Sequence, residues 1–236
     1  MSDDLENKKG DSGELKRKEE SNVKIDRLVL GPFQTNTYVV SSSDTGQAVV
    51  IDPGFQGDRI ADLIKERGLK LEQILLTHGH VDHVSAVGSL LKSLGMGEDE
   101  IPVAIHEEDV VFLENAPEMA LAFGLSVQKS VRPGKLLKEG DIIKVGGLAF
   151  RTLHTPGHTP GGVSFVMDEE GVVFVGDTLF QRSIGRTDLP GGSYSVLEAS
   201  IREKLYSLDP SMKVYTGHGP TTTIREEQRS NPFVTL

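Results

Sequence analysis

The segment from Thr77 to His83, which reads THGHVDH, constrains this 236-residue chain more than any other part of it. It places His78, His80 and His83 together with Asp82 within six residues. Four such side chains are too many for one tetrahedral ion that also binds residues elsewhere, so the segment can serve two metal ions. Asp82 could instead be the N-cap of a following helix, with the histidines on a surface loop. The density of ligand-type side chains favours the metal site.

The residues around this segment indicate a loop between a strand and a helix. The apolar run 74–76 upstream is typical of a buried parallel strand, and downstream Val84, Val87, Leu90, Leu91 and Leu94 have helical spacing. In open α/β folds, sites form at the carboxyl ends of strands and on loops held by rigid elements. The sequence therefore predicts a site at this strand end.

Three later segments repeat the same local pattern. His158 lies in the stiff turn HTPGHTPGG at 154–162, after a strand predicted at 149–153. Asp177 follows the buried strand-like run 171–176, where a charge is costly unless it is paired or bound to metal. His218 follows another strand end and enters a glycine-rich turn. We expect His154 to play a supporting or structural part and His106 to be a surface or helix-start histidine.

In order and spacing, THGHVDH, PGHTPG, GDTLF and TGHG resemble the motifs of the metallo-β-lactamase superfamily over about residues 23–236. The segment FQRSIGRTDLPGG at 180–192 and NPF at 231–233 are similar to compact glyoxalase II-like (hydroxyacylglutathione hydrolase-like) enzymes. The resemblance implies an α/β fold, the αββα sandwich of two mixed β-sheets with helices on the outer faces. It places the site along one edge.

The resemblance also implies a ligand set and a mechanism. His78, His80 and His158 would bind one metal, Asp82, His83 and His218 would bind a second, and Asp177 would bridge the two. Imidazole and carboxylate ligands suit divalent zinc, iron or manganese, and two Zn²⁺ ions are the main expectation. Metals about 3.5–4 Å apart lower the pKa of a bridging water, so hydroxide becomes available to attack a carbonyl. We expect Asp82 to have a catalytic role as well, by orienting that hydroxide.

Hydrolysis of a thioester such as S-lactoylglutathione is the predicted activity. One alternative is a persulfide dioxygenase that uses a single iron, held by His78, His158 and Asp177. Others are a lactone or other ester hydrolase, and a non-enzymatic metal-binding or partner protein. The absence of cysteine departs from the β-lactamases that bind their second metal through cysteine. A histidine at position 80, where flavodiiron-type relatives have glutamate, favours hydrolysis over oxygen reduction.

The sequence constrains the type of reaction more than it constrains the substrate. Arg182, Arg186 and Tyr194 follow Asp177 in a loop expected to overhang the metals, where they could hold a carboxylate of glutathione. The alternative is that the arginines brace the loop. Larger glyoxalase II enzymes bind glutathione largely with an added C-terminal helical domain, which this chain lacks. The sequence leaves the acyl group, the need for glutathione and the oligomeric state open.

Composition bounds the remaining expectations. Residues 1–22 are dense in charged and small residues and are predicted to be a disordered tail, and 23–236 form one domain. The net charge of −10 argues against a nucleic-acid partner. No apolar stretch is long enough to span a membrane and no signal-peptide core is present, so a cytoplasmic location is expected.

The periodicity of the chain predicts strands in the middle and helices outside. Strands are expected near 23–30, 36–40, 48–52, 74–76, 142–145, 149–153, 163–167 and 172–175. A helix at 58–67 should end at Gly68, and another is expected at 195–207. Helical structure between 107 and 125 should be interrupted or begin anew near Pro117, because proline breaks the helical hydrogen-bond pattern.

Overall fold

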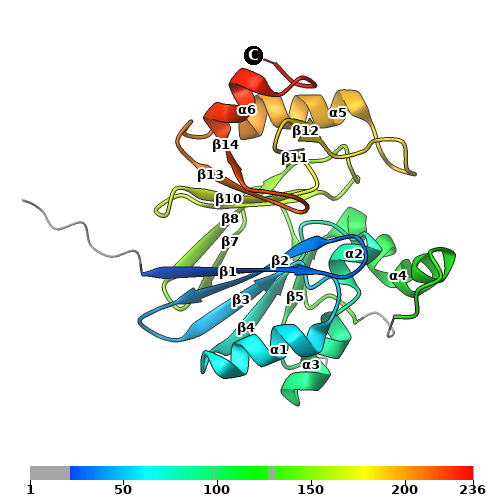
Figure 1. The fold of residues 1–236 in the computed structure, drawn as a ribbon, viewed down its shortest axis with the longest axis vertical. Helices are drawn as coiled ribbons and strands as arrows, with labels where there is room; N and C mark the ends of the chain where they lie inside the picture. The colour runs from blue at the N-terminus through cyan, green and yellow to red at the C-terminus, as the bar shows by residue number, and fades with distance from the viewer. Residues whose placement is uncertain (1–21, 98, 128–130, 236) are drawn as a thin grey trace, which may run out of the picture.

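Two six-stranded mixed sheets lie face to face, with helices on their outer sides (Figure 1). This computed structural model describes residues 22–97, 99–127 and 131–235. The predicted α/β class and αββα sandwich are confirmed. The predicted tail at 1–22 lies outside the described residues except for Asn22.

The first sheet has the strand order β1-β2-β3-β4-β5-β6. Its strands are β1 (Val23–Leu30), β2 (Thr35–Ser42), β3 (Gln47–Ile51), β4 (Lys70–Leu75), β5 (Val103–His106) and β6 (Lys135–Leu137). The first three pair antiparallel, and β3 to β6 pair in parallel. Parallel neighbours need crossover connections, and helices supply them here. These are α1 (Gly57–Glu66), α2 (Val81–Val84), α3 (Val87–Leu94) and α4 (Val110–Ala122), with a short 3₁₀ turn at Glu107–Asp109 before α4.

The second sheet has the order β14-β13-β10-β9-β8-β7. Its strands are β7 (Ile142–Val145), β8 (Leu148–His154), β9 (Val163–Met167), β10 (Val172–Gly176), β13 (Lys213–Thr216) and β14 (Thr222–Thr223). A small hairpin, β11 (Leu179–Phe180) and β12 (Ser183–Ile184), follows β10. The parallel pair β10 and β13 is connected through α5 (Tyr194–Ala199) and the π-helical turn η2 (Ser200–Leu205), and α6 (Ile224–Ser230) comes last.

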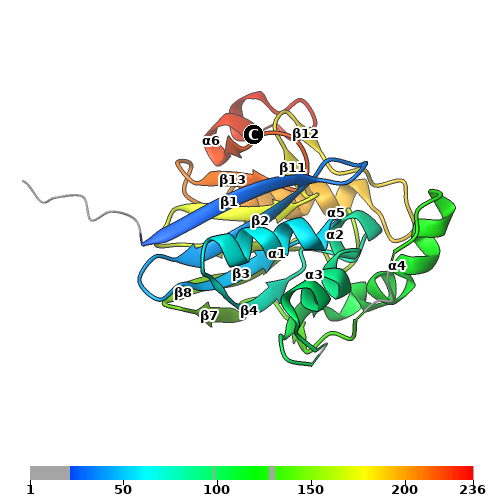
Figure 2. The ribbon, with the colours of Figure 1, turned by 60° about the horizontal axis from the view of Figure 1, so that its bottom comes forward.

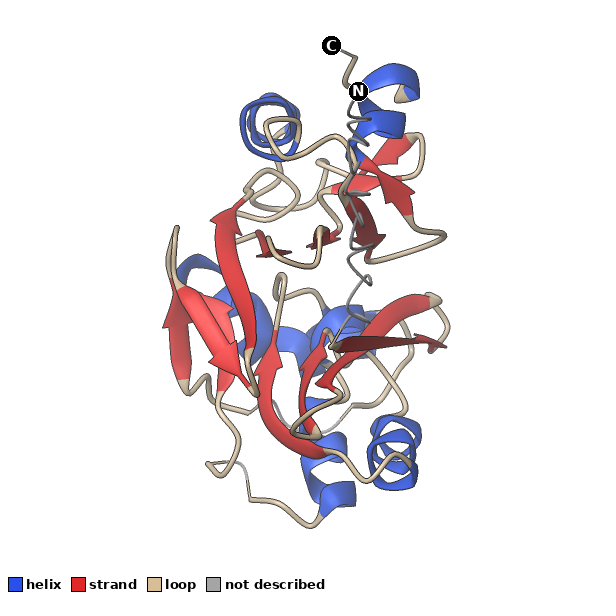
Figure 3. Cartoon of the chain, turned by 90° about the vertical axis from the view of Figure 1, so that its left-hand side faces the viewer, coloured by secondary structure: helices blue, strands red, loops and turns tan. Residues whose placement is uncertain are grey.

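The apolar side chains form three layers. The middle layer lies between the sheets and includes Phe150, Phe165 and Phe174, all nearly inaccessible to solvent. A second packs the first sheet against α1, α3 and α4, and a third packs the second sheet against α5 and η2. Figure 3 shows the strands between helices at the top and bottom, and Figure 2 shows α1 and α3 together on the outside of the first sheet.

Three helical predictions need correction. α4 runs unbroken through Pro117, because Leu113, Ala116 and Ala120 are buried on one side of it and hold both halves against the core. The helix predicted after the metal loop is divided into α2 and α3, since the Ala86 N–H donates to the Pro53 carbonyl at 2.9 Å. The helix predicted at 195–207 begins as α5 but continues as a π-helical turn.

Candidate metal centre

All seven predicted ligands come together at one edge of the sandwich. The THGHVDH segment follows β4 and runs into α2, which contains Asp82 and His83, and His158 lies on the loop between β8 and β9. Asp177 follows β10 and His218 follows β13. All seven thus lie on segments that follow the carboxyl ends of strands, and the pairing of β10 with β13 fixes Asp177 and His218 beside one another.

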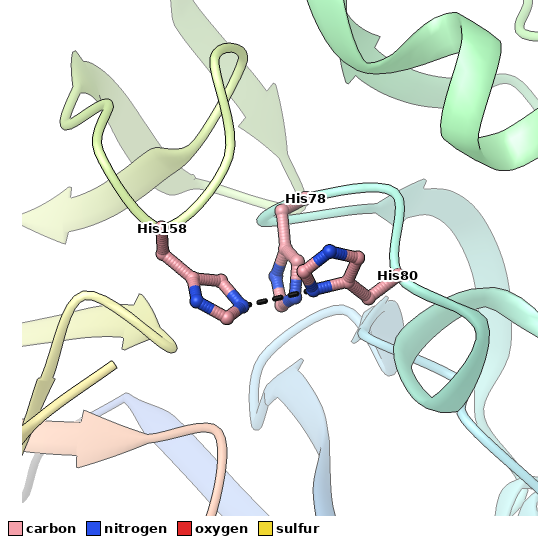
Figure 4. A group of neighbouring side chains, drawn as sticks. All are labelled: His78, His80 and His158. Atoms are coloured by element: carbon pink, nitrogen blue, oxygen red, sulfur yellow. Dashed lines mark hydrogen bonds between the residues drawn. The ribbon is translucent and has the colours of Figure 1, made fainter. Parts of the chain in front are cut away.

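His78, His80 and His158 form one group, and their rings point toward a common centre (Figure 4). All three are buried. His80 Nδ1 and His158 Nε2 are 2.9 Å apart, and the His78 ring centroid is 4.8 Å from each of the other two. His78 Nε2 is buried without a hydrogen-bond partner. A buried ring nitrogen without a partner is costly unless a ligand satisfies it.

Asp82, His83 and His218 form a second group. Asp82 Oδ2 lies 3.1 Å from His218 Nε2 and 3.5 Å from His83 Nε2, and the two Nε2 atoms are 3.4 Å apart. Atoms that bind one tetrahedral zinc ion at its usual bond lengths lie about 3.3 Å from one another. The spacing of these atoms therefore fits a single ion.

Asp177 lies between the two groups. Its Oδ1 is 3.3 Å from His83 Nε2, while its Oδ2 is 3.6 Å from His158 Nε2 and 3.5 Å from His218 Nε2. Oδ1 is buried and has no hydrogen-bond partner. One carboxylate thus faces histidines of both groups, as a bridging ligand must.

In three of the histidines, Nε2 faces the candidate metal ligands, and a hydrogen bond of Nδ1 fixes the orientation of the ring. His83 Nδ1 donates to Asp52 at 3.0 Å, His158 Nδ1 to the Arg186 carbonyl at 2.8 Å, and His218 Nδ1 to the Phe33 carbonyl at 3.1 Å. Such bonds fix the tautomer and leave the lone pair of Nε2 facing inward. Metal-binding histidines in proteins are held in this way.

Asp52 supports the site from the loop that follows β3. Its carboxylate accepts hydrogen bonds from the Thr77 N–H at 2.7 Å and the Thr77 hydroxyl at 2.6 Å, in addition to the one from His83. Asp52 is 2% exposed. It therefore ties the beginning of the metal loop to one of the predicted ligands.

The electrostatics of the site favour a cation. Burial and the neighbouring imidazoles hold the pKa of His78 well below its usual value, so its ring stays neutral. Burial also favours neutral His83, but Asp82, Asp177 and Asp52 outweigh it and raise the His83 pKa well above its usual value. Burial raises the pKa of Asp177 and the charge of His83 lowers it, with a net decrease. The buried carboxylates thus favour positive charge at this place, which divalent ions bound to the histidines would supply.

Asp109, which joins the two loops of the first histidine group, was not predicted from the sequence. Its buried carboxylate accepts hydrogen bonds from the Gly79 N–H at 2.8 Å, the Thr159 hydroxyl at 2.8 Å and the Gly161 N–H at 2.6 Å. In the sequence Asp109 ends the acidic run Glu107-Glu108-Asp109, which is typical of an exposed helix start.

His154 and His106 stack on one another, with ring centroids 4.2 Å apart. His154 Nε2 donates to the Pro160 carbonyl at 2.9 Å and so braces the loop that carries His158, in agreement with its predicted supporting part. His106 caps the 3₁₀ turn by accepting from the Glu108 N–H, which confirms a helix-start histidine. It is only 8% exposed, so the expectation of a surface position is wrong.

A cavity of about 240 Å³ opens over the two groups. Arg186 is part of its wall, but its guanidinium makes a two-point ion pair with Asp188 at 2.8 Å. Arg182 and Tyr194 are not part of that wall. Arg182 pairs with Glu226 at 3.6 Å, and the Tyr194 hydroxyl donates to the Phe233 carbonyl at 2.9 Å. Of the three predicted substrate-binding residues, the structure places one at the cavity.

The metallo-β-lactamase superfamily model matches residues 30–218, and the chain belongs to this superfamily. Hydroxyacylglutathione hydrolase GloC of Haemophilus influenzae is 42% identical over 213 residues, which cover 90% of this chain and 98% of that protein. The superfamily resemblance seen in the sequence is thereby confirmed. No helix among the described residues is long and apolar enough to cross a membrane.

Two solved structures are similar in both sequence and fold. The B3 metallo-β-lactamase BLEG-1 has a TM-score of 0.82 at 38% identity, with 90% of this chain and 100% of that chain covered. The di-iron-bound form of TTHA1623 has a TM-score of 0.79 at 42% identity, with 89% and 100% covered. These comparisons support a metal-dependent hydrolase.

Proposed function

We propose that this protein is a dinuclear metal-dependent thioester hydrolase of the glyoxalase II type. The observation that carries the proposal is the Asp177 carboxylate, whose two oxygens face the histidines of both groups. The similarity to hydroxyacylglutathione hydrolase GloC supports the thioester as substrate. Divalent ions bound at these groups would activate water and polarise the substrate carbonyl.

The residues of the chain would bind and orient the reactants. The Thr35 hydroxyl donates to Asp82 Oδ2 at 3.1 Å, which holds this carboxylate at the cavity wall. In this proposal Asp82 accepts a hydrogen bond from the attacking water and fixes its orientation. Burial raises the pKa of Asp82, but the nearby charge of His83 and the hydrogen bond with His218 lower this pKa more. The carboxylate therefore stays ionised and can accept a hydrogen bond. A thiolate leaves readily and needs little help from an acid.

Zinc is the metal we expect, with iron or manganese as the alternatives. The ligand set of imidazoles and carboxylates suits all three. The di-iron form of TTHA1623 supports iron as a real alternative for this site. We expect a small-molecule substrate and a cytoplasmic location, since neither motif nor charge points to a nucleic acid or a membrane.

The test is release of thiol from S-lactoylglutathione by the purified protein, loaded with zinc or manganese and with its metal content measured. Fast release that a chelator abolishes is the expected result. Full metal occupancy without thiol release from S-lactoylglutathione or from any other thioester would overturn the thioesterase proposal. One iron per chain together with oxygen consumption on a persulfide would instead support the dioxygenase alternative.

Ring opening of a β-lactam is a second candidate, because BLEG-1 is described as a B3 metallo-β-lactamase. A chromogenic cephalosporin added to the same assay measures it directly. We expect its hydrolysis to be much slower than that of the thioester. A faster rate on the cephalosporin would make the β-lactam the better substrate class.

A further inference from the structure

An apolar trough extends from the metal centre along α4. A second cavity of about 470 Å³ adjoins the first, and the two share His80, Met119 and Leu189 in their walls. We define the trough by the apolar side chains of both walls: Phe33, Val111, Phe112, Met119, Phe123 and Leu189. Because the walls are continuous, a chain bound in the trough reaches the predicted metal ligands.

The trough leaves large apolar side chains in contact with solvent. Phe33 is 37% exposed, Val111 51% and Phe123 58%. The rings of Phe33 and Phe123 meet edge to face with centroids 5.4 Å apart, and the Phe112 ring lies 5.7 Å from that of His80. Contiguous exposed apolar surface beside a site marks a place where an apolar ligand gains by leaving water.

The charges around the trough do not suit glutathione, which carries carboxylates. Apart from the predicted metal ligands, Arg186 and Glu118 are the charged side chains among the described residues of the two walls. The charge of Arg186 is already balanced by Asp188 through two contacts of 2.8 Å. Glu118 would repel a carboxylate. The walls therefore offer apolar contact rather than recognition of an anion.

We propose that the trough binds an apolar acyl chain of several carbons, so that the preferred substrates are thioesters of medium-chain acids rather than S-lactoylglutathione. This inference rests on the proposed thioesterase function and specifies its substrate class. The acyl chain lies against α4 and Leu189, and the thioester carbonyl reaches the centre at His80 and Asp177. The thiol half extends toward solvent.

The first experiment measures kcat/KM for acetyl, butanoyl, hexanoyl and octanoyl thioesters of one neutral thiol, N-acetylcysteamine. Burial of one methylene is worth up to about a fourfold gain. Since the trough is open to solvent, we expect kcat/KM to rise about two- to fourfold per methylene, and so at least about 16-fold between butanoyl and octanoyl. A flat series with S-lactoylglutathione as the best substrate would overturn the inference and leave the thioesterase function intact.

A matched pair of variants places the effect at the trough. Ala122 is exposed at the end of α4 and belongs to the wall, so Ala122→Glu adds a charge there without removing a core side chain. Neighbouring Leu121, which is 68% exposed, belongs to neither wall, and Leu121→Glu adds the same charge outside it. We expect Ala122→Glu to reduce the octanoyl-to-butanoyl ratio below about threefold and Leu121→Glu to retain it. Equal octanoyl-to-butanoyl ratios in the two variants would show that the acyl chain does not bind in the trough.

Calorimetric binding of the product acids, butanoate to octanoate, to the metal-loaded protein separates this inference from the proposed function. Affinity that rises about two- to fourfold per methylene, while no thioester is cleaved, would refute the thioesterase function but support binding of an acyl chain in the trough. Affinity that does not change with the length of the acid would refute binding of the acyl chain in the trough, whether or not thioesters are hydrolysed.

Discussion

Gly176 packs so closely against Thr77 that a Cβ added at Gly176 would lie 2.3 Å from the threonine hydroxyl oxygen. Gly176 ends β10 of one sheet, and Thr77 follows β4 of the other. The two sheets therefore meet at the strand ends that carry Asp177 and His78. This close approach, together with a φ of 50° at Gly176, requires glycine.

We predict that Gly176→Ala destabilises the protein by about 2–4 kcal/mol, since left-handed backbone strain and overpacking add. Gly171→Ala is the matched control, because Gly171 has a similar φ of 64° but open space around it. The free energy of unfolding of that variant should fall by only about 1–2 kcal/mol, the cost of the left-handed backbone alone. Urea unfolding of both variants in the presence of a chelator measures the difference without a contribution from metal. Equal losses of unfolding free energy in the two variants would show that Thr77 moves aside to make room for the added methyl group.

Glu139 supports the base of the His158 loop, and its contribution should depend on pH. Its carboxylate accepts from the His154 N–H at 2.6 Å and from the Lys204 ammonium at 2.9 Å. Burial raises the Glu139 pKa, but these hydrogen bonds lower it more, with a net decrease. A carboxyl with a lowered folded-state pKa stabilises above the unfolded-state pKa and loses that effect as the pH falls through the folded-state pKa.

Glu139→Gln should therefore reduce the free energy of unfolding near neutral pH by less than about 1 kcal/mol, because the side chain is half exposed. The loss should be constant from pH 8 to pH 6 and shrink once the pH falls below about 4.3. Urea unfolding across this pH range is the measurement, with the exposed Glu169→Gln as control. A loss that stays the same at every pH would mean that the shape of the side chain, and not its charge, matters.

The sequence was sufficient to place the seven candidate ligands, since each belongs to a motif at a predicted strand end. Strand ends of paired strands meet at a sheet edge, so the pairing of β10 with β13 accounts for the position of Asp177 beside His218, whereas His78 follows β4 of the other sheet. The αββα architecture, by contrast, came from the superfamily resemblance. Periodicity alone predicted strands and helices but not their order in the sheets.

Long-range contacts explain what the sequence did not predict. Asp109 appears exposed in an acidic run, and only the approach of the Gly79 and Gly161 loops makes it a buried acceptor. Arg182 lies in the turn between β11 and β12, whereas Arg186 follows β12, and only Arg186 reaches the cavity. α4 continues past Pro117 because the buried Leu113 and Ala120 outweigh the local preference.

Asp109 should control metal affinity through the loops that it joins. Asp109→Asn replaces one acceptor oxygen by an NH₂ group, which cannot accept from the loop N–H groups. We predict a loss of about 10- to 100-fold in metal affinity, as is typical for residues that orient metal ligands. Competition with a chelating dye measures this affinity, and exposed Glu107→Gln is the control for charge. Unchanged affinity in Asp109→Asn would show that the loops hold their positions without it.

Asp177 should be needed for both ions, because its oxygens lie 3.3 Å from His83 in one group and 3.6 Å from His158 in the other. We predict that Asp177→Ala reduces the metal content from two ions per chain to one or none. Turnover should fall more than about 100-fold, since even residues that only orient a ligand cost up to that much. Elemental analysis and thiol release measure the two effects, with Asp168→Ala as a control, because Asp168 pairs with Arg151 at the surface. If Asp177→Ala kept both ions and near-normal turnover, Asp177 would not bridge them, and each group would have to complete its own coordination with water.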